Sequence, residues 1–399
     1  MPWLNVFNGS SASGKSPSDR VRLGIIGVGD RGTALLLNIK SIAEILNVEV
    51  AAVCDDYVPH YQRAIELTEG KAKAFYDYRQ MLEMKDLDGV VIATPLHEHA
   101  RMTVDAFRSN IHVFCEKAMA RTIKDVRRMY ETSLQTKRIL HIGLQRMFSP
   151  VYLEGMEKIH RGDLGQITQV RAYWHRNNNW RRPVPADKPE LEKKINWRLY
   201  DDISAGLLTE LSSHQIQIAN WALQSQPVSV MGSGSINFWK DGREVYDNIA
   251  CIFSYADGTQ FLCDSLISNR HHGIEEKVLG NNGMITLETN KMYSEKPPSP
   301  PAILRLINDI EKDIFETIPI GGASWIPETA VQYTGEFITS RYRMDETKLQ
   351  MEAFVKYIRQ GEAPKELAEQ GYHASLWCLL AENAIKSGKV VTLPKGYEI

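Results

Sequence analysis

The chain has 399 residues, of which 43% are hydrophobic and 24% charged, with a formal net charge of -2 and a pI near 6.6. This length predicts two or three domains, and the composition is that of an ordinary globular protein with a sizeable core. The nearly balanced charge gives no reason to expect a nucleic-acid partner. No apolar run approaches the roughly 20 residues that span a bilayer, so we expect no membrane partner.

Residues 1–20 are expected to form a flexible N-terminal segment, because residues 9–18 are rich in glycine and serine. Residues 1–7 are short and lack the basic start of a signal peptide, which favours a cytoplasmic protein. Removal of an export leader would instead indicate the periplasm. The five cysteines favour buried thiols over a disulfide framework, although Cys251 and Cys263 flank an expected hairpin and could form one bridge.

A glycine-rich turn follows the first expected strand, residues 21–26, and leads into a helix. Its spacing is Gly-x-Gly-x-x-Gly, in which the first glycine permits a tight turn and the second lets the backbone approach a pyrophosphate. The third lets the helix pack closely on the strand, while the helix N-terminus offers free N–H groups to an anion. The expected dinucleotide-binding residues of this turn are Gly27, Gly29, Asp30, Arg31 and Gly32.

A second apolar strand, residues 48–54, ends in Asp55 and Asp56. A carboxylate at this place would accept hydrogen bonds from an adenosine ribose and repel a 2′-phosphate. Asp55 therefore favours NAD over NADP, with Asp56 as an alternative ribose carboxylate. The other interpretation is a simple turn with a solvated pair of aspartates.

Strands and helices alternate from here to about residue 148. We expect strands near residues 72–76, 87–94, 111–117 and 138–144, and helices at 59–69, 78–85, 99–109 and 123–136. Nearly continuous apolar strands separated by helices are typical of a doubly wound parallel sheet. The sequence thus predicts an N-terminal Rossmann domain over residues 21–148, with its site beyond the carboxyl ends of the strands.

After residue 149 the pattern changes to strands joined by hairpins, which predicts an α+β domain over residues 149–345. A helix at 151–161 precedes expected strands at 169–175, 228–239, 245–255, 260–268 and 275–279, and residues 256–259 are a hairpin signal. The sheet should be large, open and mainly antiparallel, with one face free to form a homodimer or homotetramer. Residues 297–301 read as a surface excursion. Helices at 349–359 and 374–385, within residues 346–399, should return towards the first domain.

Two polar clusters lie where strands of the first domain end. Thr94, Pro95 and His99 are expected to form a wall of the nucleotide crevice; the alternatives for His99 are a helix cap, a solvated histidine or, with His97, a metal ligand. We expect no metal, because no third ligand occurs at a recognisable spacing. The second cluster is Glu116-Lys117, in which the lysine would hold a substrate hydroxyl, unless the two residues form a structural ion pair.

A third cluster lies on an expected helix, where Glu210 and His214 are four residues apart and hence on one face. Histidine suits proton transfer near neutral pH, and a neighbouring carboxylate would orient it and favour its protonated form. The alternative is an ordinary surface pair. Together with the nucleotide turn, these clusters predict a dehydrogenase in which Lys117 and His214 take part in transfer of the substrate's hydroxyl proton.

The order of these motifs resembles that of the Gfo/Idh/MocA oxidoreductases, over roughly residues 20 to 395. The resemblance implies a Rossmann domain followed by an open-faced sheet domain that often mediates dimers or tetramers. It also implies Lys117 as the family's lysine, His214 as acid/base and Glu210 as the carboxylate that orients it. Ala118 replaces the family's proline, Ala205 a glycine, and Glu210 the more common aspartate. A longer carboxylate at this position could reshape the sugar pocket or take over the proton role itself.

The remaining candidates are rich in tryptophan, asparagine and arginine, which suits a pyranose because rings stack on its C–H face and donors bind its hydroxyls. Glu116 and Gln145 complete the expected cofactor site, and the expected substrate residues are Arg146, Trp174, Asn178, Trp180, Arg181, Trp197 and Arg198. A polar surface loop with packed tryptophans is the alternative.

The sequence therefore predicts an NAD-dependent dehydrogenase acting on a secondary hydroxyl of a sugar, glycoside or cyclitol. One alternative is a glycoside hydrolase that uses NAD for transient oxidation, elimination and re-reduction. A non-catalytic relative is disfavoured by the intact Gly27, Lys117 and His214.

Overall fold

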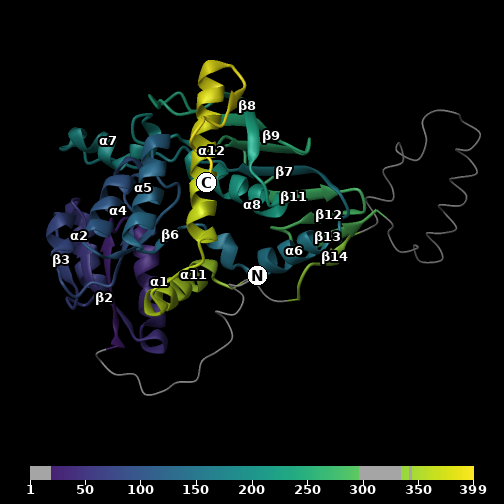
Figure 1. Ribbon diagram of the computed structural model, residues 1–399. Helices are drawn as coiled ribbons and strands as arrows, with labels where there is room; N and C mark the ends of the chain where they lie inside the picture. Colours follow the sequence, from purple (N-terminus) through teal and green to yellow (C-terminus); the bar gives the residue numbers. More distant parts are fainter. Residues whose placement is uncertain (1–18, 296–333, 341–343) are drawn as a thin grey trace, which may run out of the picture.

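The computed structural model describes residues 19–295, 334–340 and 344–399, which build two β-sheets with helices packed against them (Figure 1). The expected flexible segment at residues 1–20 lies almost entirely outside the described residues, as does the expected excursion at 297–301. The predicted fold class, a parallel Rossmann sheet followed by a mainly antiparallel sheet, is confirmed.

The first sheet has six parallel strands in the order β3-β2-β1-β4-β5-β6. They are β1 (Val21–Ile26), β2 (Val48–Cys54), β3 (Lys73–Phe75), β4 (Gly89–Ile92), β5 (His112–Cys115) and β6 (Leu140–Ile142). The intervening helices are α1 (Asp30–Leu46), α2 (Val58–Leu67), α3 (Tyr78–Leu82), α4 (His99–Arg108) and α5 (Ile123–Thr136). The order reverses between β1 and β4, which is the point where helices change from one face of a doubly wound sheet to the other.

Local sequence explains these elements. β4 and β5 are buried along their whole length, as expected of apolar strands covered on both faces. The helix predicted at residues 123–136 has those bounds, and its first turn is capped by Thr122, whose hydroxyl accepts a hydrogen bond from the Asp125 N–H.

Within the described residues, the second sheet has nine strands in the order β14-β13-β12-β11-β7-β10-β9-β8-β15, and among these only the β7–β10 neighbours are parallel. They are β7 (Ile167–His175), β8 (Pro227–Ser235), β9 (Asn248–Tyr255), β10 (Gln260–Leu266), β11 (Ile274–Gly280), β12 (Gly283–Thr286), β13 (Lys291–Ser294), β14 (Glu336–Phe337) and β15 (Val391–Thr392). The predicted hairpin joins β9 to β10 and places Cys251 opposite Cys263. Both are buried free thiols, so the conceivable disulfide is absent.

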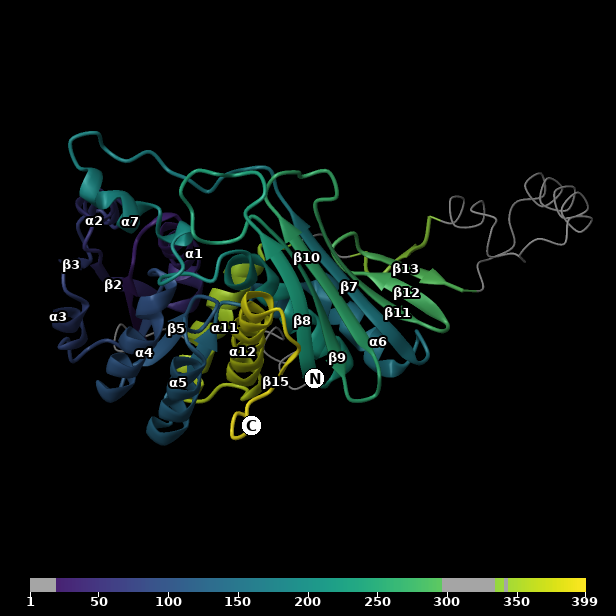
Figure 2. The same cartoon turned by 90° about the horizontal axis from the view of Figure 1, so that it is seen from above.

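Long helices connect the two sheets (Figure 2). α6 (Pro150–Arg161) and α8 (Ser213–Leu223) pack together, and α8 also packs on the second sheet. α11 (Glu346–Gln360) packs on α1, while α12 (Glu366–Ser387) contacts α5 and β6 of the first sheet as well as α8 and β8. An ion pair also joins α12 to the first domain: Arg121, between β5 and α5, pairs with Glu382 of α12 at 2.8 Å. None of the described helices is long and apolar enough to cross a membrane.

The contact between α12 and β6 gives a stability test. A Cβ atom at Gly371 would lie 2.4 Å from Cγ1 and 2.7 Å from Cβ of Ile142, so Gly371→Ala forces the helix away from the sheet. We expect a loss of about 1–3 kcal/mol in the free energy of unfolding, measured by urea denaturation. Asn383→Ala on an exposed position of the same helix is the control and should change it little; equal effects of both variants would contradict this packing.

Candidate active site

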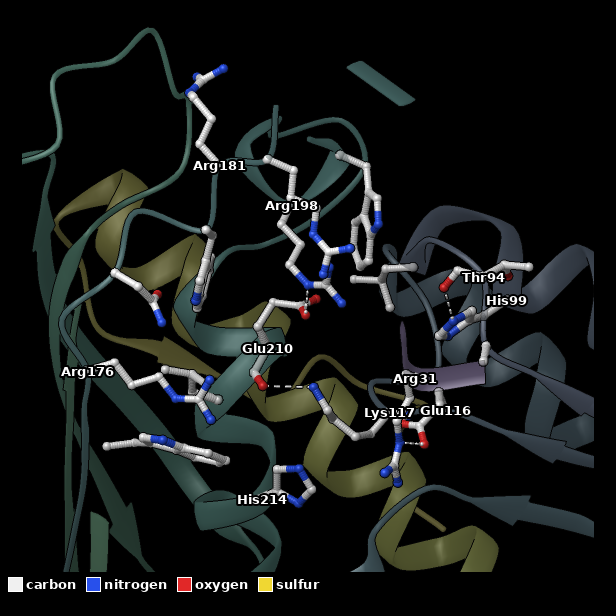
Figure 3. A pocket seen from close by; sticks show the side chains of 18 of the residues that line it. Arg31, Thr94, His99, Glu116, Lys117, Arg176, Arg181, Arg198, Glu210 and His214 are labelled. Atoms are coloured by element: carbon white, nitrogen blue, oxygen red, sulfur yellow. Dashed lines mark hydrogen bonds and ion pairs between the residues drawn. The ribbon is translucent and has the colours of Figure 1, made fainter. Parts of the chain in front are cut away.

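A cavity of about 590 Å³ lies beyond the carboxyl ends of β4 and β5, between the two sheets (Figure 3). The predicted residues that line it are Arg31, Thr94, His99, Glu116, Lys117, Gln145, Trp174, Asn178, Trp180, Arg181, Trp197, Arg198, Glu210 and His214. Gly27, Gly29, Asp30, Gly32, Asp55, Pro95 and Arg146 are not among the lining residues. Arg176, Asn179 and Arg182 also line the cavity; they belong to the same Trp/Asn/Arg-rich run as the predicted residues but were not singled out as substrate residues.

The glycine turn has the shape that a dinucleotide requires. Gly27 has φ +84°, and a Cβ there would lie 2.8 Å from the Ala93 backbone; a Cβ at Gly32 would lie 1.9 Å from the Gly27 carbonyl oxygen. No described side chain caps the N-terminus of α1, which follows Gly29. Its first N–H groups are therefore free to meet a phosphate, and the residues fit the group that the motif predicts.

Asp55 is buried at the end of β2, next to this turn. One carboxylate oxygen accepts a hydrogen bond from the Val28 N–H at 2.7 Å and the other from the Tyr57 N–H at 2.8 Å. These bonds fix the carboxylate beside the glycine turn. Asp56 is exposed and pairs with Lys194 at 2.8 Å, so the two aspartates have different surroundings.

Glu116 and Lys117 point to different partners, which excludes the simple ion pair between them. Glu116 binds Arg31 at 2.7 Å. Lys117 Nζ donates to the carbonyl oxygen of Glu210 at 2.7 Å and lies 3.4 Å from that of Thr209. Burial lowers the pKa of Lys117, although Glu210 and Glu116 oppose this shift.

The prediction that Glu210 orients His214 is wrong for the structure described. Residues Leu208–Ser212 form a π-helical turn ahead of α8, and Glu210 accepts a hydrogen bond from Nε of Arg198 at 2.8 Å. No hydrogen bond or ion pair joins Glu210 to His214 among the described contacts, and Nδ1 of His214 is buried without a partner. Figure 3 shows the two side chains extending in different directions from the helix.

The charges around His214 also differ from the expectation. Burial lowers its pKa well below the usual 6.5, and the nearby cations Arg146 and Lys117 lower it further, so the ring is neutral rather than protonated. For Glu210, burial opposes ionisation, but Lys117 and Arg198 keep the pKa of the carboxyl below its usual value. The site therefore combines a neutral imidazole with an ionised carboxylate.

His99 is a fixed wall residue, neither solvated nor a metal ligand. Its ring nitrogens lie 2.9 Å from the carbonyl oxygens of Ala118 and Thr94, and burial lowers its pKa. The Lys117–Ala118 peptide bond is cis. No group of three potential metal ligands occurs in the part of the chain that the structure describes.

The prediction that Arg146 is a substrate residue needs correction. It is buried, and its guanidinium pairs with Glu276 at 2.5 Å, away from the cavity. It also lies 5.3 Å from the ring centre of Trp174 and 5.5 Å from that of Tyr152, both by cation–π contact. Since the ring centres of Trp174 and His214 are 5.8 Å apart, Arg146 supports the wall from behind.

The outer wall is a long irregular segment held by ion pairs. Arg198 stacks on Trp197, with its Cζ 4.2 Å from the ring centre. Arg182 pairs with Asp30 of the nucleotide turn at 2.6 Å, so this segment reaches from the second sheet across to the first. Trp180 has a positive φ of +60° within the same segment.

Comparison with known proteins identifies the family. Residues 21–144 match the oxidoreductase family with an NAD-binding Rossmann fold, and residues 152–286 match the GFO/IDH/MocA C-terminal domain. The chain belongs to the Gfo/Idh/MocA family. The predicted family and the NAD cofactor are thereby confirmed.

The individual relatives share only low sequence identity with this chain. Myo-inositol 2-dehydrogenase of Thermotoga maritima is 22% identical over 380 residues, covering 94% of this chain and 98% of that protein. Glycosyl hydrolase family 109 protein 1 of Shewanella sp. (strain MR-4) is 27% identical over 189 residues, but the match covers only 45% of this chain and 39% of the relative. The structure of levoglucosan dehydrogenase in complex with NADH and levoglucosan superposes with a TM-score of 0.72 at 18% identity, over 94% of this chain and 100% of the other.

The two aspartates after β2 provide a matched test of cofactor choice. Asp55→Asn removes the charge beside the glycine turn, so we expect NAD to bind about ten- to a hundredfold more weakly while NADP is affected less. Asp56→Asn is the control, because its carboxylate pairs with Lys194. The measurement is the dissociation constants of NADH and NADPH from fluorescence titration. An unchanged NAD/NADP ratio in Asp55→Asn would rule out Asp55 as the ribose carboxylate.

Proposed function

We propose that this protein transfers a hydride between NAD and a secondary hydroxyl of a sugar, glycoside or cyclitol. The main observation is that Lys117 and His214 line one cavity together, opposite a wall of tryptophan, asparagine and arginine side chains. The names of the relatives, myo-inositol 2-dehydrogenase and levoglucosan dehydrogenase, support the same class of substrate.

Lys117 holds the substrate oxygen. An ammonium has three N–H donors; one goes to the Glu210 carbonyl and a second faces that of Thr209. The third is left for a substrate hydroxyl, and the charge then stabilises an oxyanion as the C–H bond breaks.

His214 takes the proton. Its imidazole is neutral, buried and without a hydrogen-bond partner at Nδ1, so it can accept a proton from the substrate hydroxyl during oxidation and return it during reduction. Glu210 keeps Arg198 in place above the cavity and balances the charge of Lys117.

The cofactor site combines the glycine turn with polar residues at the strand ends. The residues that would hold NAD are Gly27, Gly29, Asp30, Arg31, Gly32, Asp55, Thr94, Pro95, His99, Glu116 and Gln145. When bound, NAD supplies the hydride acceptor that no side chain of the site provides. Trp174, Asn178, Trp180, Arg181, Trp197 and Arg198 would bind the carbohydrate, by ring stacking and hydrogen bonds to hydroxyls.

The second sheet is proposed to form the contact in a homodimer or homotetramer. Met231 of β8 and Ile252 of β9 are cross-strand neighbours and are 50% and 37% exposed, and Val228 on the same strand is 46% exposed. Such adjacent apolar side chains favour association.

The proposed domains are residues 21–148 and 149–345, followed by the helices of residues 346–399. The free thiols support the cytoplasm as the compartment.

His214→Ala tests the proton acceptor. We expect turnover to fall by about two orders of magnitude or more, because the general base is lost, with NAD affinity unchanged. His97→Ala is the control, since His97 pairs with Glu98 and does not line the cavity. Near-normal turnover of His214→Ala with a sugar that reduces NAD would show that another group takes the proton.

The pH dependence tests the surroundings of His214. The neutral ring accepts the proton, so kcat/KM should fall as the pH drops through the His214 pKa, and this acid limb should lie below pH 6.5. Arg146→Gln removes a cation that lowers this pKa, so the limb should move to higher pH, whereas Arg146→Lys should keep it near its original place. The measurement is kcat/KM against pH, and identical limbs in all three proteins would contradict the effect of Arg146.

The hydrolase alternative shares the first hydride transfer and is separated by its products. A panel of sugars and nitrophenyl glycosides is assayed with and without added NAD, following both NADH absorbance and nitrophenol. A dehydrogenase gives NADH in proportion to the oxidised sugar. Nitrophenol release without net NADH would instead support transient oxidation and elimination.

A further inference from the structure

Most charged side chains of the cavity are already neutralised by a partner. The two carboxylates, Glu116 and Glu210, pair with Arg31 and Arg198, respectively. Arg181 and Arg182 bind carboxylates beyond the lining residues, namely Glu192, Asp241 and Asp30. These four arginines are therefore not available as free positive charges.

Arg176 is the arginine of the cavity that has no acidic partner among the described residues. Its backbone N–H donates to the Leu266 carbonyl at 2.9 Å, which fixes the chain at the end of β7. Its guanidinium lies over Trp174, with Cζ 4.9 Å from the ring centre. Figure 3 shows the side chain extending into the cavity on the side of His214. Partial burial lowers its pKa.

Lys117 is the other cation without a carboxylate hydrogen-bond partner, but backbone carbonyls occupy two of its donors, and we have assigned the third to the reacting hydroxyl. Arg176 thus provides a second positive charge on the same side of the cavity as the substrate wall. Its planar fork of N–H donors matches a carboxylate in geometry and charge.

We propose that the substrate carries a carboxylate, as in a uronic acid or its glycoside, and that Arg176 binds it. This inference rests on the proposed oxidation of a carbohydrate and narrows its substrate class. A singly charged group is favoured over a phosphate because one guanidinium is free and the ionised Glu210 also faces the cavity. Trp174 holds the guanidinium flat, while the neighbouring Asn178 adds an amide donor.

The test compares neutral and acidic sugars of the same configuration. Methyl glucoside is paired with methyl glucuronide, and methyl galactoside with methyl galacturonide, using NAD-saturated protein. NADH formation gives kcat/KM, and isothermal titration calorimetry on NADH-saturated protein, which cannot oxidise the sugar, gives the affinity independently of turnover. For at least one pair we expect the uronide to bind about tenfold or more tightly than the neutral glycoside.

Arg176→Gln should reduce the uronide-to-neutral affinity ratio by about ten- to a hundredfold, because it removes the charge but keeps an amide. Arg171→Gln is the matched control: Arg171 is exposed on β7, the strand that ends just before Arg176, its side chain binds Gln169, and it does not line the cavity. Its ratio should equal that of the unmodified protein.

Each outcome separates the two proposals. Oxidation with no preference for the uronide, or an equal loss for both sugars in Arg176→Gln, overturns the carboxylate and keeps the dehydrogenase. A stronger preference for the corresponding 6-phosphate also overturns it. Uronide binding that depends on Arg176 without NADH formation supports the carboxylate site but contradicts the oxidation, whereas no uronide binding overturns the carboxylate site.

Discussion

The hydrogen bond from Lys117 Nζ to the Glu210 carbonyl joins the two halves of the site. Lys117 follows β5 of the parallel sheet, and Glu210 belongs to the π-helical turn ahead of α8, which packs on the second sheet. A buried ammonium needs acceptors, and the backbone of this turn supplies them without cancelling the charge. The other groups of the site are placed relative to this contact, since Glu210 holds Arg198 and α8 carries His214.

The position of this lysine sets the electrostatics of its neighbours. Its charge favours the ionised form of Glu210 and the neutral form of His214, and Arg146 acts on His214 in the same sense from behind Trp174. Because Arg146 is buried against Glu276, its effect on the cavity is that of a fixed charge rather than a mobile side chain. In the proposed reaction, His214 then accepts the proton and Lys117 stabilises the oxyanion, which is the division of roles that hydride transfer from an alcohol requires.

The sequence predicted those parts of the site that depend on local geometry. The glycine turn and Asp55 are set by a strand, a turn and a helix within one unit, so their spacing determines their arrangement. Side-chain partners were harder to predict. Consecutive residues after a strand point to different sides, and thus Glu116 meets Arg31 while Lys117 meets Glu210. Gln145 and Arg146 also diverge, but within the 3-10 turn of residues Gln145–Phe148: one lines the cavity and the other enters the core.

The spacing of Glu210 and His214 correctly placed both residues in one helical stretch. It could not reveal the π-helical turn or the hydrogen bond from Arg198 to the Glu210 carboxylate. Arg198 lies in a short 3-10 helix, Trp197–Leu199, and its side chain meets Glu210 only through the tertiary fold. The same contrast explains why the reaction class is better determined than the substrate. Lys117 and His214 lie at the ends of regular elements packed in the core, whereas the wall that contains Arg176 and Trp180 is irregular and is held by side-chain pairs. Such a segment can change its side chains without disturbing either sheet, so we expect its uncompensated charges, rather than the fold, to select the substrate.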